Sequence, residues 1–235
     1  MEVKKVKLYE FSELPEQIRK EMIDEKRWDI GYGAMEVNSD ERMNTLHEFE
    51  SIFGIKVDFE VDYCSYWSRV KFNNYAYEGW NDCAWYQIDY DEVKGSLLLR
   101  FLNSKFDSLN ERKTYWGHGK YDENGKYLGS AKRKSRIQWD SCCPLTGVCY
   151  DEDILQPIRD FLKKPHKDWT LKDLIEDCVD SFLKSWHKEY EYCCDDEDFL
   201  EEEMENRYEG DLFYENGVQF KGVYEPELEE VEATA

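Results

Sequence analysis

The chain has 235 residues, of which 31 are Lys or Arg and 53 are Asp or Glu, so its formal net charge at pH 7 is −22. A surface this acidic repels phosphate, which excludes ordinary nucleic-acid binding. No apolar run approaches the roughly 20 residues of a membrane span and no signal peptide opens the chain, so we expect a soluble intracellular protein without membrane contact. The eight Trp and seventeen Tyr residues add buriable surface, which favours a folded protein with a core.

The first 54 residues predict a strand and two helices. The strand covers residues 3–9. Ser12 is expected to cap the helix that follows. Residues 29–40 predict a loop. The second helix is expected over residues 41–53, with Gly54 as its stop signal.

The clearest strand in the sequence covers residues 55–63, where apolar and charged side chains alternate. This alternation predicts a one-sided antiparallel sheet. Two more strands are expected in the aromatic-rich residues 66–90, and residues 96–106 fit either a helix or a strand. The aromatic cluster at residues 63–90 has two interpretations: sheet core with amphipathic surface aromatics, or a platform that stacks bases or sugars.

The middle of the chain predicts a long hairpin over residues 113–139, because Asn-Gly within residues 123–125 is a strong hairpin signal. A loop is expected at residues 141–150. The next helix covers residues 151–163 and contains Pro157, an unusual residue for a helix interior.

Thr170 is predicted to cap the strongest helix. Apolar residues follow with i, i+3, i+4, i+7 spacing, which is typical of a helix with one buried face: Leu171, Leu174, Ile175, Cys178, Val179, Phe182, Leu183 and Trp186. The acidic segment is expected to form another helix over residues 195–206, anchored by Phe199 and Met204.

These elements predict an α+β fold, with an antiparallel sheet and hairpins packed by several helices. We expect a single domain over residues 1–224. Its last elements are the acidic C-terminal helix and a hairpin over residues 211–221. An acidic tail at residues 225–235 is expected to be disordered.

The acidic residues are concentrated near the carboxyl end. Residues 189–235 contain 18 acidic and two basic residues, a net charge of −16, whereas the first 188 residues carry −6. The opposite extreme is residues 112–136, with eight basic and two acidic residues. An acidic run can be a solvated face that keeps a protein soluble. Alternatively, spaced carboxylates on a helix imitate a phosphate backbone, because a helix with acids at two of every three positions has a linear charge density comparable to that of DNA.

No catalytic motif of high specificity is present, so an enzyme is the less favoured reading, and we predict no catalytic residue, metal or cofactor. The eight cysteines have poor spacing for zinc and are expected to be free thiols, although Cys142, Cys143 and Cys149 could close a site with His118. The basic residues 112–136, which we call the basic hairpin, either contact a phosphate-bearing ligand or neutralise the protein's own acidic helix. The candidate ligand or phosphate contacts are His118, Lys132, Arg133 and Arg136.

Two long segments resemble one family. The opening LYEFSELPEQIRKEMID and the later run CPLTGVCYDEDILQPIRDFLKKP, with the residues that follow it, are similar to a group of small acidic phage and prophage proteins that are often labelled antitoxin-like. A central glycine-rich stretch of that group is replaced here by residues 67–72. The resemblance implies a mobile-element origin and a bacterial cytoplasm, and supplies no mechanism.

The leading hypothesis combines this origin with the concentrated acidity. The chain is predicted to be an anti-defence protein that blocks a host nucleic-acid-acting effector, such as a CRISPR nuclease or a restriction enzyme, by occupying its Lys/Arg groove. Nearby aromatic side chains are expected to supply anchoring energy. The residues predicted to bind the partner are Asp195, Asp196, Glu197, Asp198, Glu201, Glu202, Glu203, Glu205 and Glu209.

Two alternatives stay open. An antitoxin-like protein would neutralise one cognate toxin, which requires a dedicated partner. An enzyme would bind or degrade a nucleotide signal through the basic hairpin and His118.

Overall fold

The computed structural model of the chain describes residues 6–72, 77–78, 85–86, 88–109, 112–113, 120–124, 126–129, 138–139 and 143–222. The chain divides into two compact units. Unit 1 combines residues 1–37 with residues 189–235, and unit 2 holds residues 38–188. The single domain predicted over residues 1–224 stays a prediction, and the tail predicted at residues 225–235 lies outside the described residues.

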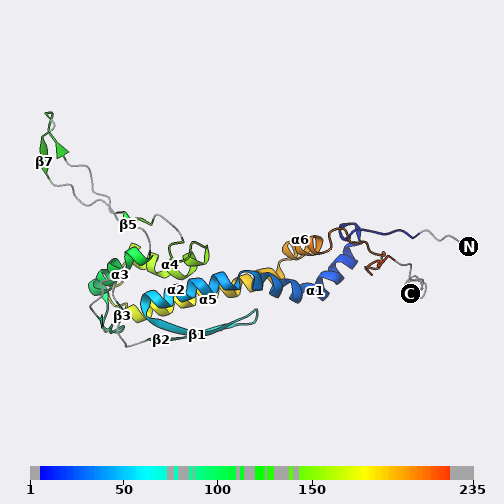
Figure 1. The fold of residues 1–235 in the computed structure, drawn as a ribbon, viewed down its shortest axis with the longest axis horizontal. Helices are drawn as coiled ribbons and strands as arrows, with labels where there is room; N and C mark the ends of the chain where they lie inside the picture. Colours follow the sequence, from blue (N-terminus) through cyan, green and yellow to red (C-terminus); the bar gives the residue numbers. More distant parts are fainter. Residues whose placement is uncertain are drawn as a thin grey trace, which may run out of the picture. The chain divides into compact units, whose positions relative to one another are not determined.

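The described part of the chain has helices and antiparallel strand pairs, which confirms the α+β class. Figure 1 labels most of these elements. In chain order they are η1 (Phe11–Glu13), α1 (Glu16–Val37), α2 (Ser39–Phe53), β1 (Ile55–Val61), β2 (Tyr66–Phe72), β3 (Tyr77–Glu78), β4 (Trp85–Tyr86), α3 (Gly95–Leu109), β5 (Arg112–Lys113), β6 (Lys120–Tyr121), β7 (Tyr127–Gly129), β8 (Gln138–Trp139), α4 (Tyr150–Lys163), α5 (Leu171–Asp195) and α6 (Glu197–Arg207).

The loop predicted at residues 29–40 is wrong, because α1 continues as a helix to Val37. Gly31 and Gly33 lie within this helix. Gly31 serves close packing: a Cβ atom added there would lie 2.3 Å from the Sγ atom of Cys194 in α5. Glycine is thus required here by the approach of two helices rather than by a turn.

The N-terminal predictions are partly correct. Ser12 lies inside the short 3-10 helix η1, and α1 begins only at Glu16, so Ser12 does not cap it. Residues 6–9 form no ladder, and Tyr9 makes one antiparallel bridge to Phe213. The second helix, α2, ends as predicted at Gly54, whose left-handed φ of 67° suits glycine.

The core of unit 1 holds α6 against the N-terminal residues. Leu200 and Met204 of α6 are fully buried and belong to one apolar cluster with Ile23 and Ile30 of α1 and with Phe213. Because residues 200 and 204 are one helical turn apart, the fully buried part of α6 is a narrow stripe. The predicted anchor Met204 is confirmed.

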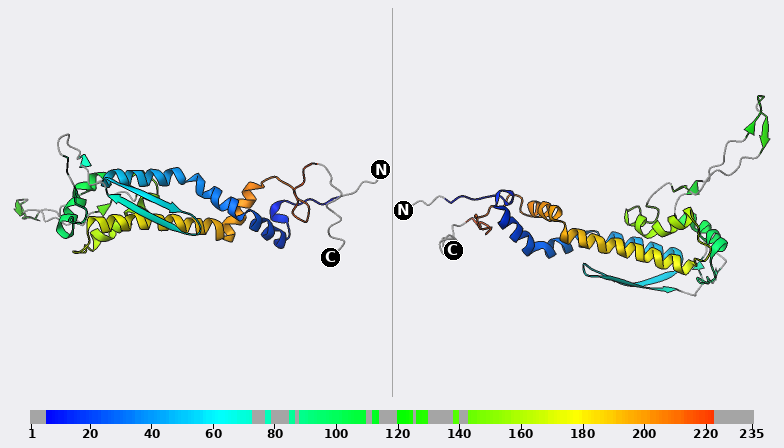
Figure 2. Two further views of the ribbon diagram at one scale, coloured as in Figure 1. Left: turned by 90° about the horizontal axis from the view of Figure 1, so that it is seen from below. Right: turned by 180° about the vertical axis from the view of Figure 1, so that it is seen from behind.

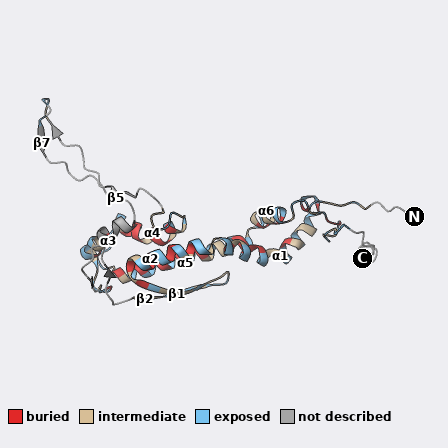
Figure 3. Ribbon diagram, viewed as in Figure 1, coloured by how far each residue is buried: buried red, intermediate tan, exposed pale blue. Residues whose placement is uncertain are grey.

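Unit 2 is layered around α2 and α5, which lie side by side (Figures 1 and 2). The β1–β2 hairpin covers one side of this pair, and Phe59 of β1 contacts Trp186 of α5 at 5.6 Å between ring centroids. Helix α4 covers the opposite side. The predicted rhythm of α5 is confirmed, because all eight of its apolar positions are buried. Figure 3 shows buried and exposed residues alternating along this helix.

The strands confirm several predictions. β1 pairs with β2 in antiparallel register from Ile55 opposite Phe72 to Val61 opposite Tyr66. The described part of residues 66–90 contains three strands, β2, β3 and β4, where two were expected. The ambiguous residues 96–106 belong to helix α3. The predicted long hairpin is present in its described parts, as β6 pairs with β7 and β5 with β8.

Pro157 lies in the interior of α4, and a hydrogen bond from α5 compensates for its missing N–H group. Proline lacks an N–H group, so the carbonyl of Asp153, four residues earlier, loses its helical donor. The hydroxyl of Ser181 in α5 donates to this carbonyl at 2.9 Å, and the hydroxyl of Ser185 donates to the Asp153 carboxylate at 2.8 Å. The proline therefore creates an acceptor that joins α4 to α5.

We predict that the hydroxyl of Ser181 contributes to stability only while Pro157 is present. The substitution Ser181→Ala should lower the free energy of unfolding by about 1–2 kcal/mol, because it leaves a carbonyl without a donor. In a Pro157→Ala background the new N–H group can serve the Asp153 carbonyl, so the same change should cost less than about 0.5 kcal/mol. Urea unfolding of the four proteins gives the coupling, and equal costs in both backgrounds would contradict the assignment.

Glu50 of α2 has an almost fully buried carboxylate, with 4% of the side chain exposed. It accepts hydrogen bonds from Lys56 Nζ at 2.8 Å, from the Val57 amide at 2.7 Å and from His47 Nδ1 at 3.2 Å. Burial alone would raise the pKa of Glu50, but these hydrogen bonds outweigh it and hold the pKa below its ordinary value. The carboxylate thereby ties α2 to the start of β1.

This lowered pKa predicts a pH-dependent contribution to stability. The contribution is present above pH 4.5, the ordinary pKa of glutamate, and is lost as pH falls through the lower pKa of the folded state. We expect Glu50→Gln to lower the free energy of unfolding by about 1–3 kcal/mol at neutral pH and by much less at pH 3. Urea unfolding of both proteins across this range measures the difference, and a difference that is constant with pH would refute the prediction.

Candidate functional site

The fold places most of the negative charge in unit 1. Residues 1–37 and 189–235 contain 27 acidic and nine basic residues, a net charge of −18, which leaves −4 for residues 38–188. Within the described part of unit 1, 21 acidic residues face seven basic ones. Unit 1 is therefore the more strongly acidic of the two units.

Helix α6 is the densest acidic element of unit 1 and is displaced from its predicted bounds. The prediction began at Asp195, but this residue ends α5. The next residue, Asp196, has extended backbone angles, and its carboxylate accepts a hydrogen bond from the Phe199 amide at 2.8 Å. Asp196 is therefore the cap of α6, and its carboxylate is used to satisfy the first turn.

Two arginines of α1 bind one flank of α6. Arg27 donates to Glu197 at 2.6 Å, to Asp24 at 2.8 Å and to the carbonyl of Cys194 at 2.8 Å. The hydrogen bonds that Arg27 donates to Glu197 and Asp24 raise its pKa above the ordinary value. Arg19 forms a second ion pair, with Glu201. These pairs fix the rotation of α6 and turn two of the predicted partner-binding residues toward the protein itself.

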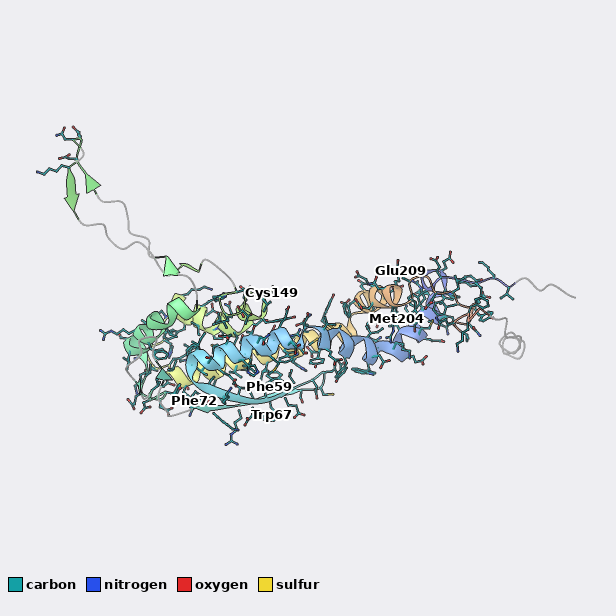
Figure 4. The ribbon with its side chains drawn as sticks, viewed as in Figure 1. Phe59, Trp67, Phe72, Cys149, Met204 and Glu209 are labelled. Atoms are coloured by element: carbon teal, nitrogen blue, oxygen red, sulfur yellow. The ribbon has the colours of Figure 1, made fainter. Side chains whose placement is uncertain are left out.

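Another face of α6 points to solvent. Asp198, Glu202 and Glu205 follow i, i+4, i+7 spacing, which places them on one face, and all three are exposed. They form no ion pair with any residue that the structure describes. We call these three residues the outer acidic row. Glu203 is half-buried, and Glu209 is exposed beyond the end of the helix (Figure 4).

An exposed aromatic ring accompanies the outer acidic row. Tyr192 of α5 has 53% of its surface exposed, and its ring lies 5.4 Å from that of Phe199. Loss of hydration and the nearby acids, Asp196, Glu202 and Asp198 among them, raise the pKa of Tyr192. The expectation of an aromatic side chain beside the acidic face thus has a specific candidate.

The predicted acidic site residues therefore divide into groups with different surroundings. Asp196 caps α6, while Glu197 and Glu201 pair with arginines. Asp195 closes α5 and has a partner of its own. For the outer acidic row and for Glu203 and Glu209, the role in partner binding stays a prediction. The predicted ligand contacts all lie outside the described residues: His118, Lys132, Arg133 and Arg136.

Sequence reasoning missed the residues that position this site. Arg19 and Arg27 lie more than 160 residues from the acids that they bind, and nothing in their local sequence indicates this contact. Tyr192 was detectable in principle, since it is the aromatic residue just before the acidic run. The Trp28 and Tyr32 side chains, which are also exposed in unit 1, carried no signal that separates them from core residues.

Unit 2 contains a fully buried carboxylate that has a structural role. Asp151 accepts hydrogen bonds from the amides of Leu145 and Thr146, both at 2.7 Å, and from Gly147 at 3.2 Å. The hydroxyls of Thr45 and Thr146 also donate to it, at 2.9 and 2.8 Å. With its acceptor sites occupied, this carboxylate holds the loop before α4 against α2 and has no capacity for a ligand.

Other candidate chemistry lacks support in the described residues. They contain no group of three or more His, Cys, Asp or Glu side chains that could hold a metal ion. The six cysteines among them are free thiols, of which Cys143 and Cys149 belong to the cluster considered for zinc. Cys142 lies outside the described residues. None of the described helices has the length and apolar character needed to cross a membrane.

Of the aromatic cluster at residues 63–90, Phe72 packs on the buried Tyr90 at 4.8 Å between ring centroids. Trp67 is half-exposed, and its indole N–H donates to Glu60 at 2.8 Å. These contacts favour the sheet-core interpretation for the described members.

Comparison with known proteins finds no match: no family model, no curated protein and no solved structure is similar to this chain at a significant level.

We predict that the two flanks of α6 respond oppositely to loss of charge. The double substitution Glu197→Gln and Glu201→Gln should lower the free energy of unfolding by about 1 kcal/mol, because it breaks two partly exposed ion pairs. The variant with Asp198→Asn, Glu202→Gln and Glu205→Gln should be as stable as the wild type or up to about 0.5 kcal/mol more stable, because it removes repulsion between like charges. Chemical unfolding measures both, and a destabilised outer-row variant would show that these acids are bound to the protein itself.

Proposed function

We propose that this protein is an acidic inhibitor that binds a nucleic-acid-acting host effector, such as a CRISPR nuclease or a restriction enzyme, by nucleic-acid mimicry. The outer acidic row of α6 occupies a Lys/Arg groove of the effector that otherwise holds a phosphate backbone. The observation that supports this proposal is the orientation of α6. Its arginine pairs lie on one flank, and Asp198, Glu202 and Glu205 are exposed on another.

The pairing inside unit 1 lowers the charge density that a partner meets. Helix α6 has 11 residues and is therefore about 16 Å long. Four of its carboxylates, the outer acidic row and Glu203, lack an ion pair among the described residues, so one unpaired charge occurs about every 4 Å. One DNA strand carries a phosphate about every 3.4 Å of axis, and the duplex one every 1.7 Å. The proposed mimic thus resembles one strand better than a duplex.

Charge alone provides steering more than affinity, because exposed ion pairs are weak and are screened by salt. Tyr192 lies beside the outer acidic row with half of its surface exposed. Tyrosine is enriched among residues that dominate binding energy at interfaces. We therefore assign Tyr192 as the anchor and the carboxylates as the groups that set orientation and association rate.

The test is an inhibition assay on purified effectors. A panel of RNA-guided nucleases and restriction endonucleases cleaves labelled DNA with and without the protein, at low and high salt. We expect stoichiometric inhibition of one effector, weakened by salt. Neutralising the outer acidic row, with Asp198→Asn, Glu202→Gln and Glu205→Gln, should weaken inhibition at least about tenfold, since three charge contacts contribute about 0.5–1 kcal/mol each.

The matched control removes three exposed carboxylates from unit 2. The substitutions Glu41→Gln, Glu48→Gln and Glu176→Gln cause the same change in net charge at positions without an ion pair among the described residues. This variant should inhibit as well as the wild type. Equal losses in both variants would mean that only net charge matters, and an absence of inhibition across the panel would contradict the proposed function. Capture of one small dedicated protein instead would favour the antitoxin-like alternative.

A further inference from the structure

Helix α1 of unit 1 has an exposed face on which two large aromatic side chains lie among acidic ones. Trp28 and Tyr32 have 48% and 43% of their surfaces exposed. Their ring centroids lie 6.5 Å apart, and the Tyr32 ring lies 5.3 Å from that of Tyr190 in α5. We call these three residues the aromatic ladder. Exposed aromatic side chains that contact one another in a row mark an interaction surface more often than isolated ones do.

The same face of α1 contains only acidic charges. Glu21, Glu25, Asp29 and Glu36 are exposed and share this face with Trp28 and Tyr32, because the six positions follow helical spacing. The basic residues of α1 lie elsewhere on the helix. Arg19 and Arg27 bind the acids of α6, and Lys20 pairs with Glu16.

This combination selects among possible occupants. An apolar helix placed on the aromatic ladder would desolvate neighbouring carboxylates without giving them partners, which is costly. A nucleic acid that stacked its bases there would bring phosphates close to four acids. An arginine side chain satisfies both features, because its planar guanidinium stacks on aromatic faces and its N–H groups bind carboxylates in pairs.

We propose that the aromatic ladder and the acids beside it form a docking surface for an arginine-bearing segment of a protein partner. Guanidinium groups stack on Trp28 and Tyr32 and donate hydrogen bonds to the flanking carboxylates, with Glu25 and Asp29 nearest in the helical pattern. The surface belongs to α1 and is separate from the outer acidic row of α6. The inference therefore does not rest on the proposed function and applies to any partner that presents arginine.

Arginine specificity separates this surface from general charge attraction. Lysine carries the same charge but has a strongly hydrated ammonium group that stacks less well. An octa-arginine peptide should bind more tightly than an octa-lysine peptide, by about two- to fivefold for each stacked guanidinium. Fluorescence anisotropy of the labelled peptides on the full chain measures this ratio at one salt concentration.

The decisive variant removes both exposed rings, with Trp28→Ala and Tyr32→Ala. The preference for arginine over lysine should fall to nearly one, while the affinity for octa-lysine stays within about twofold. The matched control is Trp67→Ala, which removes an equally exposed ring from unit 2 and should leave the preference unchanged. A second variant, Trp28→Leu with Tyr32→Leu, keeps apolar area but lacks aromatic faces and should also lose the preference. Circular dichroism verifies the fold of each protein.

The outcomes separate this inference from the proposed function. Neutralising the outer acidic row should weaken both peptides equally and leave the arginine preference intact. An arginine preference that survives removal of Trp28 and Tyr32, or equal affinities of both peptides for the wild type, would overturn the docking surface. Neither result depends on whether any nuclease is inhibited.

Discussion

Repulsion between carboxylates is the constraint that unit 1 must overcome in order to fold. Its described part carries 21 acidic and seven basic residues. Apolar contacts supply the main attraction, since Leu200 and Met204 are completely buried against the N-terminal segment. Arg19 and Arg27 then place positive charge where α6 meets α1. Because so few bases are available, their position decides which acids are neutralised and which stay exposed.

The proposed recognition properties follow from this division of one helix. The carboxylates beside α1 form ion pairs within the protein, whereas those of the outer acidic row are exposed to solvent. The short acidic helix thereby presents its unpaired carboxylates on one face instead of evenly around its axis. The exposed rings of Tyr192 on α5 and of Trp28 on α1 add what charge cannot supply, namely apolar area that a partner can bury.

The sequence predicts elements where a local pattern determines the structure. Alternation identified β1, and helical spacing identified the buried positions of α5 from Leu171 to Trp186, because burial of one face is encoded at short range. The spacing did not identify Cys193 and Cys194, which are buried near the end of α5. The prediction of a loop at residues 29–40 was wrong because Gly31 is needed for a close contact with Cys194, which is distant in sequence, and not for a turn. The candidate site was found by composition alone, so its acids were treated as equivalent. Their differences depend on Arg19 and Arg27, whose contacts arise only after the chain ends meet.

The close approach at Gly31 has a chemical consequence. The thiol of Cys194 is completely buried, next to the bare backbone of α1, and burial together with Asp195 raises its pKa, although Arg27 opposes this. Both burial and the scarcity of thiolate protect the sulfur from alkylating reagents. Modification of Cys194 therefore requires α1 to separate from α5. The rate of its alkylation thus reports how often unit 1 opens locally.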